Sequence, residues 1–152
     1  MNKDQALPWD NPRFRNWIAV ARACQVVNQR LARELAALDI KVPHLDILAN
    51  VYRHEGISQQ DLARKLLVGR SNISMLIPQI EKRNLIERRP DNDDKRVLRL
   101  FLTDKGREIT RAALDIELKI IEMSMSTSST DECNLVGDVM NRMIENMSLS
   151  CE

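Results

Sequence analysis

The sequence predicts a mainly α-helical fold that contains one small β-hairpin. Only four of its 152 residues are glycine, whereas average usage of about 7% would supply about eleven, and this scarcity disfavours a turn-rich all-β fold. Several long stretches carry apolar residues at intervals of three and four, which is the period of an amphipathic helix. One pair of short alternating segments flanks a polar turn, which is typical of a hairpin.

The length and hydropathy of the chain suit one domain with helical extensions. No apolar run approaches the ~18 residues that a membrane-spanning helix needs. The N-terminal residues also lack the basic and then apolar profile of a secretory signal peptide. We therefore expect a cytoplasmic protein without a membrane partner.

The net charge of +1 conceals an uneven distribution. Between Arg64 and Arg107 the sequence has 12 Lys and Arg residues against six Asp and Glu, and elsewhere it has 11 against 16. A basic middle with acidic flanks predicts a polyanion-binding module carried by a helical frame. The alternative is a chance clustering of solvated faces.

The first predicted helix is long and amphipathic. Its apolar residues form a seam that is interrupted at Asn28: Phe14, Trp17, Ala21, Cys24, Leu31, Leu35 and Leu38. Such a seam is longer than one small domain needs, so we expect part of it to face a second subunit. We assign residues 1–42 to an N-terminal dimerisation helix; the alternative is a helix that lies across its own core.

A helix-turn-helix follows. Pro43 suits the first turn of a leading helix over residues 43–53. The next helix begins at the N-cap Ser58, with Asp61 as an acidic third residue, and is expected to continue through Leu67. After a tight Val-Gly turn, a further helix points four apolar residues inward: Ile73, Leu76, Ile77 and Ile80.

The segments after these helices predict the hairpin. Residues 85–89 form a short strand, residues 90–94 a polar turn, and residues 96–102 a second strand. In the second strand three apolar residues alternate inward: Leu98, Leu100 and Leu102. A helix-turn-helix followed by a hairpin is a winged helix, which we assign to residues 43–102 as a DNA-binding domain.

The remaining residues, 103–152, predict two helices that complete the dimerisation frame. Thr103 caps the first, whose apolar residues again repeat at four and three: Ile109, Ala113, Ile116, Ile120 and Met123. After a Ser/Thr-rich break, Ser129 and Glu132 predict a capping box that opens the last helix. The three units are expected to form one compact chain.

Five short motifs of the winged-helix segment stand in order: LARKL at 62–66, IS at 73–74, IEKRNLIER at 80–88, DDKR at 93–96 and LTDKG at 102–106. Together they resemble the MarR-type winged helix-turn-helix transcriptional regulators, over about a third of the chain. The resemblance implies a homodimeric repressor or activator whose first and last helices interlock. It also implies that DNA is released when a small ligand binds or a cysteine is oxidised.

The second helix of the helix-turn-helix carries the side chains expected to read DNA. With its apolar face turned inward, six residues point outward: Arg70, Ser71, Asn72, Ser74, Met75 and Gln79. Arg can pair with guanine, Asn or Gln with adenine, and Ser with a base or a phosphate, while Met can touch a thymine methyl group. We add Ser58 to this DNA-contacting set; the alternative for each side chain is a solvated helix face.

The resemblance implies a second DNA contact, by the wing. Arg96 corresponds to the family's wing arginine and is expected to enter the minor groove, while Lys95 is expected to meet a phosphate. Since the neighbouring acids would repel DNA, we assign Asp94 to orient Arg96 or another basic residue through a charge-assisted hydrogen bond. The alternative is that residues 91–94 form a simple acidic turn.

Three residues depart from the family pattern. Pro78 lies inside the predicted recognition helix, where it removes a backbone hydrogen bond, so we expect a kink that weakens the case for Gln79 as a DNA contact. Gly69 stands where the family commonly has Ser and still serves as an N-cap. Asn84 replaces the usual Gly after the helix and tolerates the left-handed conformation required there.

The sequence gives weaker indications of a sensor. The resemblance places family ligands between the first, second and fifth helices, where Trp17, Leu48 and Tyr52 could line a pocket, although core packing is the alternative for all three. Cys24 lies on the apolar seam and is expected to be a buried structural cysteine. Cys133 and Cys151 are candidates for oxidation.

Catalytic and cofactor sites are not indicated. His44 and His54 are ten residues apart, which matches no tight metal motif, and no phosphate loop or catalytic triad stands out. We therefore expect no enzyme, no cofactor and no metal.

The sequence predicts a DNA-binding transcriptional regulator, a repressor, that binds palindromic operators as a homodimer and is released by a small-molecule ligand. One alternative is a winged-helix protein-interaction module without a specific DNA target. The other is a redox-responsive regulator that uses Cys133 or Cys151.

Overall fold

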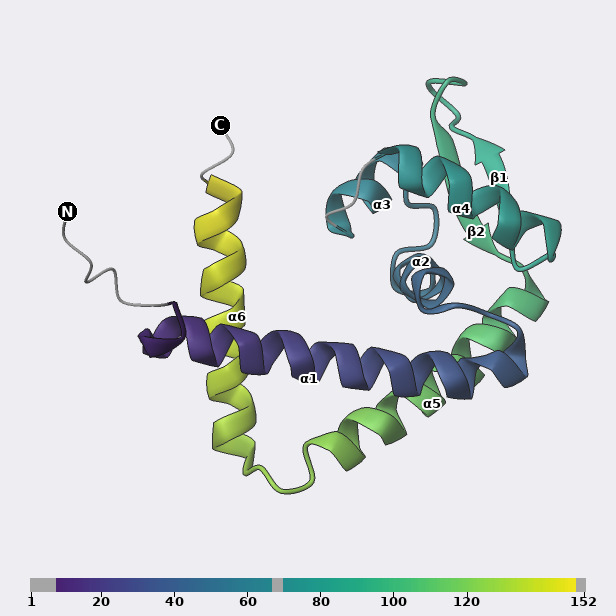
Figure 1. Ribbon diagram of the computed structural model, residues 1–152. Helices are drawn as coiled ribbons and strands as arrows, with labels where there is room; N and C mark the ends of the chain where they lie inside the picture. The colour runs from purple at the N-terminus through teal and green to yellow at the C-terminus, as the bar shows by residue number, and fades with distance from the viewer. Residues whose placement is uncertain (1–7, 67–69, 150–152) are drawn as a thin grey trace.

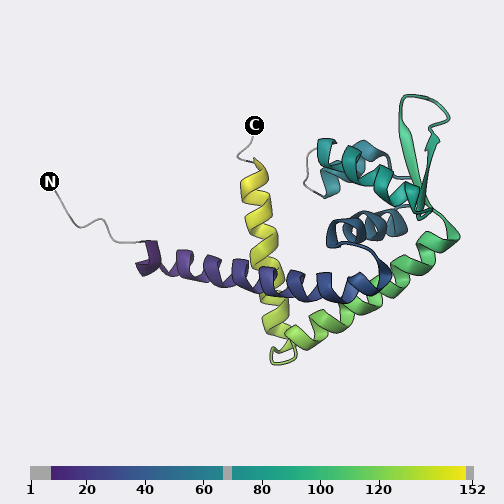
Figure 2. The same cartoon turned by 45° about the vertical axis from the view of Figure 1, so that its right-hand side comes forward.

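The structure is a computed structural model that describes residues 8–66 and 70–149. Within these residues it confirms a mainly helical chain with one antiparallel hairpin. The elements follow in the order η1 (Pro8–Asp10), α1 (Pro12–Leu35), η2 (Ala36–Leu38), α2 (Val42–Arg53), α3 (Gln59–Lys65), α4 (Arg70–Lys82), β1 (Ile86–Pro90), β2 (Leu98–Leu102), α5 (Asp104–Ser124) and α6 (Thr130–Leu149). Figures 1 and 2 show α2, α3, α4 and the hairpin gathered into one lobe, from which α1 and α5 extend as long helices.

Helix α1 confirms the long helix but divides its apolar seam into two halves. Asn11 caps it by accepting a hydrogen bond from the Arg13 backbone N–H at 2.8 Å. Only Leu31 and Leu35, near its C-terminal end, are buried in the core, whereas Trp17 is 49% exposed. Cys24 is exposed as well, so the prediction of a buried structural cysteine is wrong for the single chain.

The lobe is built around α2, which supplies the centre of the core. Its buried residues are His44, Leu45, Ile47, Leu48 and Val51. Apolar residues of α3, α4 and both strands close around them, including Leu62, Ile73, Ile77, Ile80, Leu85, Ile86 and Leu100. This arrangement buries the apolar face that the spacing of the two short helices predicts.

Helix α3 begins as predicted and ends earlier than predicted. The hydroxyl of Ser58 accepts a hydrogen bond from the Asp61 backbone N–H at 3.0 Å, which is the expected N-cap. The helix stops at Lys65, and Leu66 is its C-cap. Leu67 and the predicted turn with its N-cap Gly69 lie outside the described residues.

The hairpin gains a third, short strand-like segment from the chain before α3. Ile86 pairs with Leu102 and Pro90 with Leu98 in the β1–β2 register. Leu100 accepts a hydrogen bond from the Gly56 N–H at 2.8 Å and donates one to the Ile57 carbonyl at 3.0 Å. Gly56 reaches this position with φ of +83°, a conformation that favours glycine. The wing is thereby fastened directly to the start of α3.

Strand β2 begins two residues later than predicted, at Leu98. The Val97 N–H donates to the Asp94 carbonyl at 2.9 Å, so the preceding residues close a turn instead of pairing with β1. Arg96 consequently lies in the wing loop rather than in the strand. The inward alternation of the strand is confirmed, since Leu100 and Leu102 are buried.

Helix α4 continues through Pro78 and ends at a left-handed residue. Asn84 has φ of 57°, as predicted. Its N–H donates to the Glu81 carbonyl at 2.9 Å and that of Leu85 to the Ile80 carbonyl at 3.2 Å, which together form a Schellman motif. Whether Pro78 bends the helix stays a prediction.

Helix α5 starts against the exit of α4. Thr103 caps it by accepting the Gly106 N–H at 2.9 Å, and its hydroxyl donates to the Asn84 carbonyl at 2.5 Å. A Cβ atom placed on Gly106 would lie 1.8 Å from the carbonyl oxygen of Leu85, so only glycine allows this approach. The start of α5 is thus locked to the residues that follow α4.

Helix α6 opens with the predicted capping box and exposes much of its apolar surface. The Ser129 N–H donates to Glu132 Oε2 at 2.7 Å, and the Glu132 N–H donates to Ser129 Oγ at 3.3 Å. Large apolar side chains are exposed on α1, α5 and α6: Phe14, Trp17, Ile18, Val26, Leu118, Ile121, Met123, Leu135, Val136, Met143, Ile144 and Met147. Among the described residues, no helix is long and apolar enough to cross a bilayer.

Replacement of Gly106 by Ala should destabilise the fold. The added methyl group would collide with the Leu85 carbonyl, and relief requires a backbone shift that costs about 2 kcal/mol or more. Gly137→Ala on α6 is the matched control, because its Cβ would meet nothing within 4 Å and alanine favours a helix. Urea unfolding followed by circular dichroism measures both, and equal midpoints for the two variants would refute the close approach.

Candidate nucleic-acid interface

The exposed side of α4 carries three of the predicted DNA-reading side chains. Asn72, Ser74 and Met75 are exposed, and Met75 keeps 65% of its surface accessible. Ile73 and Ile77 anchor the helix from beneath, because both are fully buried. Helix α4 begins at Arg70, but the side chains of Arg70 and Ser71 lie outside the part that the structure describes. The first two turns of α4 therefore present a polar surface with one flexible apolar contact.

The wing loop is organised by Asp91. Its Oδ1 accepts the backbone N–H of Asp93 at 2.9 Å and of Asp94 at 3.1 Å, while its Oδ2 accepts a hydrogen bond from Arg99. Arg99 in turn donates to the Gly56 carbonyl at 2.9 Å. These bonds, above all the one from Arg99, lower the pKa of Asp91 from 3.8 to about 2. An acid of the predicted polar turn thus builds the loop from inside rather than facing solvent as an isolated charge.

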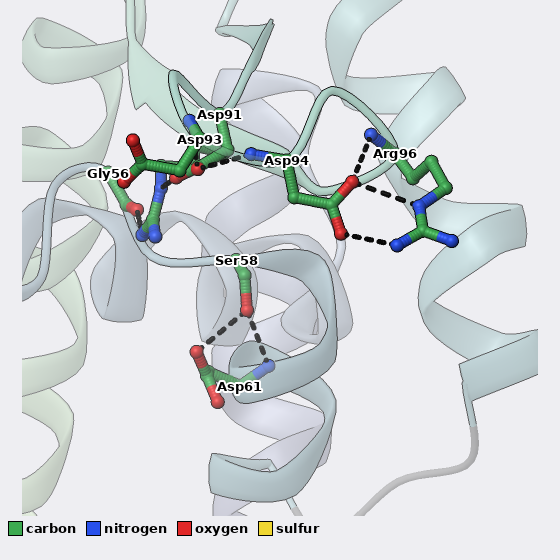
Figure 3. A network of polar contacts seen from close by, with 8 residues as sticks. Gly56, Ser58, Asp61, Asp91, Asp93, Asp94 and Arg96 are labelled. Atoms are coloured by element: carbon green, nitrogen blue, oxygen red, sulfur yellow. Dashed lines mark hydrogen bonds and ion pairs between the residues drawn. The ribbon is translucent and has the colours of Figure 1, made fainter.

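Arg96 is held at the surface by Asp94. The two guanidinium nitrogens Nε and Nη2 each lie 3.0 Å from a carboxylate oxygen, and the Arg96 backbone N–H donates to the same carboxylate at 3.0 Å (Figure 3). This contact lowers the pKa of Asp94 and raises that of Arg96. The Arg96 side chain is nevertheless 91% exposed. The predicted contact between Asp94 and Arg96 is present, and it leaves one face of the guanidinium open.

A hollow of about 240 Å³ lies between α3, α4 and the wing, which together line it. Three segments line it: Ser58, Gln59 and Gln60 at the start of α3, Ile73 and Ser74 of α4, and Arg96, Val97 and Leu98 of the wing. The structure therefore brings together three of the predicted DNA-contacting residues, Ser58, Ser74 and Arg96, which the sequence separates by up to 38 positions. The guanidinium makes the hollow suitable for an anionic group such as a phosphate.

Sequence reasoning missed Gln59 and Gln60 at this hollow. They directly follow the N-cap Ser58 on the face that turns toward the wing. Gln59 is partly buried, and its Oε1 atom is buried without a hydrogen-bond partner in the described residues. The position after a predicted N-cap in a helix-turn-helix is the signal that would have identified them.

Two predicted DNA contacts are engaged elsewhere. Ser58 is buried, and its hydroxyl both accepts the Asp61 N–H and donates to Asp61 Oδ2 at 2.7 Å, as Figure 3 shows. Gln79 lies against α2: its Nε2 donates to the Met75 carbonyl at 3.2 Å, and its Oε1 is 3.3 Å from His44 Nε2. These bonds give each side chain a role within its own fold, and a DNA contact by Ser58 or Gln79 stays a prediction.

The tautomer of His44 follows from its two partners. The Lys41 backbone N–H donates to Nδ1 at 3.4 Å, so the proton of the neutral ring is on Nε2, which donates to Gln79. Burial lowers the pKa of His44 and favours this neutral form. Hydrogen bonds therefore connect the start of α2 to the third turn of α4.

The three residues predicted to line a ligand pocket have different surroundings in the single chain. Leu48 is fully buried in the core, and the Tyr52 hydroxyl accepts a hydrogen bond from Arg111 Nε at 2.9 Å. Trp17 lies on the exposed half of α1, 14 residues before Leu31, which corresponds to about 21 Å along a helix. The shared ligand pocket stays a prediction, since core packing holds Leu48 and Trp17 lies on the exposed half of α1.

The other candidate groups are the cysteines and the possible metal ligands. Cys133 is half-buried near the start of α6, and Cys151 lies outside the described residues. Within the described part of the chain, no three His, Cys, Asp or Glu side chains gather where they could hold a metal ion.

Comparison with known proteins agrees with this architecture. A sequence model of the MarR family matches residues 38–97. The chain is 27% identical over 113 residues to the uncharacterized HTH-type transcriptional regulator YdgJ of Bacillus subtilis, covering 74% of this chain and 69% of YdgJ. It is also 27% identical over 123 residues to the transcriptional repressor MprA of Escherichia coli K12, covering 81% of this chain and 64% of MprA. The solved complex of S. aureus MepR with DNA superimposes with a TM-score of 0.79 at 23% identity, over 85% of this chain and 96% of MepR.

The titration of Asp91 should report the order of the wing loop. Its pKa of about 2 lies below the ordinary 3.8, so its contribution to stability is complete above pH 4 and is lost as the pH falls from about 4 toward 2. In Arg99→Met, which lacks the main bond to the carboxylate, the midpoint should rise toward 3.8. Carboxyl carbon NMR measures both proteins, and an identical midpoint in the two would contradict the assigned role of Arg99.

Proposed function

We propose that the chain is a MarR-type winged-helix regulator, and that it is a sequence-specific repressor that binds palindromic operators as a homodimer. In this proposal residues 1–42 and 103–152 form the dimerisation frame, and residues 43–102 form the DNA-reading lobe. The observation that carries the proposal is the convergence of α3, α4 and the wing around one cationic hollow.

Major-groove reading is assigned to the first two turns of α4. Asn72 can pair with adenine, Ser74 can bond a base or a phosphate, and Met75 can contact a thymine methyl group. Arg70 and Ser71 complete this set as predictions from the sequence. Gln79 is left out of this proposed set because its amide is bonded to Met75 and His44.

Minor-groove reading is assigned to Arg96, with Lys95 beside it on a phosphate. The carboxylate of Asp94 aligns the guanidinium in advance, which lowers the ordering cost of binding. Exposed ion pairs of this kind contribute little net stability, so Arg96 can exchange part of its contact with Asp94 for the negative potential of a narrow groove. The hollow next to it then receives a backbone phosphate between α3 and the wing.

A homodimer would cover the apolar faces that one chain leaves open. These faces lie on the N-terminal half of α1, on the C-terminal half of α5 and along α6. Helix α1 has five Arg residues and one Glu, whereas α6 has four acidic residues and one Arg. This opposite charge supports a pairing in which α1 of one copy faces α6 of the other. Two-fold symmetry would place the recognition helices about 34 Å apart, one turn of DNA.

Repression and release by a small molecule are the finer parts of the proposal. Repression is supported by the similarity to MprA, a transcriptional repressor. A protein that occupies an operator blocks transcription without further contacts, so this is the simplest regulatory action of a DNA-binding dimer. The existence of a small-molecule effector and its binding site in the fold stay predictions.

In vitro selection followed by fluorescence anisotropy tests the DNA contact. Selection should enrich a palindrome, and Arg96→Ala should weaken binding to it about tenfold and lower the salt slope by about one, as expected for one lost charged contact. Arg111→Ala, which removes an equal charge from α5, should leave both values unchanged. Enrichment of no sequence would instead favour the protein-interaction module.

Sedimentation tests the dimer. The protein should have twice the chain mass of 17.5 kDa, and Ile144→Glu should shift it to the monomer because a charge would be buried in the interface. Asn92→Glu places the same charge in the wing turn and should remain dimeric. A dimeric Ile144→Glu protein would exclude α6 from the interface.

A further inference from the structure

The C-terminal end of α4 lies beside the C-terminal end of α1 and its extension η2. We call this place, where Arg83 contacts Leu38 and Asp39, the joint. Helix α1, extended by η2, ends at Asp39 with φ of 53°, and α4 ends at Asn84 with φ of 57°. At the first end the Ile40 N–H donates to the Leu35 carbonyl at 3.4 Å, which repeats the bond between Leu85 and Ile80 at the second. Each helix therefore stops abruptly, and the carbonyls of its last turn point toward the joint.

Arg83, the residue that follows α4, bridges the joint. Its Nη1 donates to the Asp39 carbonyl, and its Nη2 donates to the Leu38 carbonyl at 3.2 Å and lies 3.4 Å from Asp39 Oδ2. The Leu38 carbonyl belongs to the last turn of η2 and has no partner within the helix. A guanidinium is favoured there because the C-terminal end of a helix is the negative end of its dipole. Arg83 thus caps the dimerisation helix from the end of the recognition helix.

The surroundings of Arg83 indicate a joint and not a ligand site. A groove of about 610 Å³ lies here, with Lys41, His44, Gln79 and Arg83 among its lining residues. The side chains of His44 and Gln79 are bonded to each other, and Gln79 also bonds the Met75 carbonyl. Arg83 is bonded to the carbonyls of Leu38 and Asp39. These groups consequently gain their partners from the fold itself.

The geometry of this joint affects which spacing between operator half-sites a dimer can bind. If the frame of a homodimer sets the distance between two copies of α4, the angle at which each α4 leaves the frame sets the distance between their tips. An insertion of one base pair moves a half-site by about 3.4 Å along the DNA. The same insertion rotates the half-site by roughly 35° about the DNA axis. A joint that holds α4 at one angle therefore restricts the dimer to one spacing, whereas a looser joint would accept neighbouring spacings.

We propose that Arg83 is a positioning residue that fixes the angle between α4 and the α1–η2 helix and thereby the half-site spacing of the operator. The inference rests on the proposed function as a dimeric DNA reader. Arginine suits the role because its planar fork can bond two carbonyls at once, whereas the single ammonium of lysine forms no such fork. Arg83 itself is not required to touch DNA.

Operators with the selected half-sites and a central spacer lengthened or shortened by one or two base pairs test the proposal. The wild-type protein should prefer the selected spacing over its neighbours by about tenfold or more. Arg83→Met should reduce this preference to about threefold or less while retaining the base preferences within each half-site, and Arg83→Lys should be intermediate. Arg111→Met, which removes another charged side chain and its bond to Tyr52, should keep the wild-type preference.

The outcomes separate the two proposals. If the wild-type protein binds no selected sequence, the proposed function fails. If it binds and Arg83→Met keeps the wild-type spacing profile, the role of Arg83 is overturned while the function stands. Thermal unfolding accompanies each variant, and failure of both Arg83→Met and Arg83→Lys to fold would also overturn the proposal, since Arg83 would then be a requirement of the fold.

Discussion

The approach of Gly106 to the Leu85 carbonyl is the constraint on which the rest of the structure depends. At this crossing the exit of α4, the end of β2 and the start of α5 meet at the Leu85 carbonyl, which also accepts a hydrogen bond from the Thr103 N–H at 3.1 Å. The hydroxyl of Thr103 bonds to Asn84 and caps α5 at once. The reader lobe and the helical frame are therefore joined through backbone groups, which do not change rotamer.

Some polar side chains of the lobe are hydrogen-bonded within the fold and hold its surface in place, whereas others are exposed and available to contact DNA. Asp91, Arg99 and Ser58 have their partners within the fold and hold the wing and α3 in place. Asn72, Met75 and Arg96 extend into solvent from this rigid support. Rigid placement matters because each bond to a base then costs little side-chain and loop entropy.

Most of the fold could be predicted from the sequence because its signals are local. The N-caps at Ser58 and Thr103, the capping box at Ser129 and the left-handed Asn84 each depend on residues within a few positions. Two omissions concern groups whose partners lie far away in the sequence. Gln79 finds His44 at a separation of 35 residues, and Arg83 finds the Asp39 carbonyl at 44. Helical periodicity states which face a side chain occupies, but it does not identify the element that approaches this face.

The exposure of Cys24 and Trp17 has the same origin and a further consequence. Periodicity marks one seam along α1 that is interrupted at Asn28, but the single chain buries only the half that holds Leu31 and Leu35. Leaving an apolar face of this extent in water is unfavourable, so whatever covers it contributes free energy that the isolated chain lacks. When a second copy covers it, stability and DNA affinity both depend on protein concentration, because the same association completes the frame and places two recognition helices on one operator.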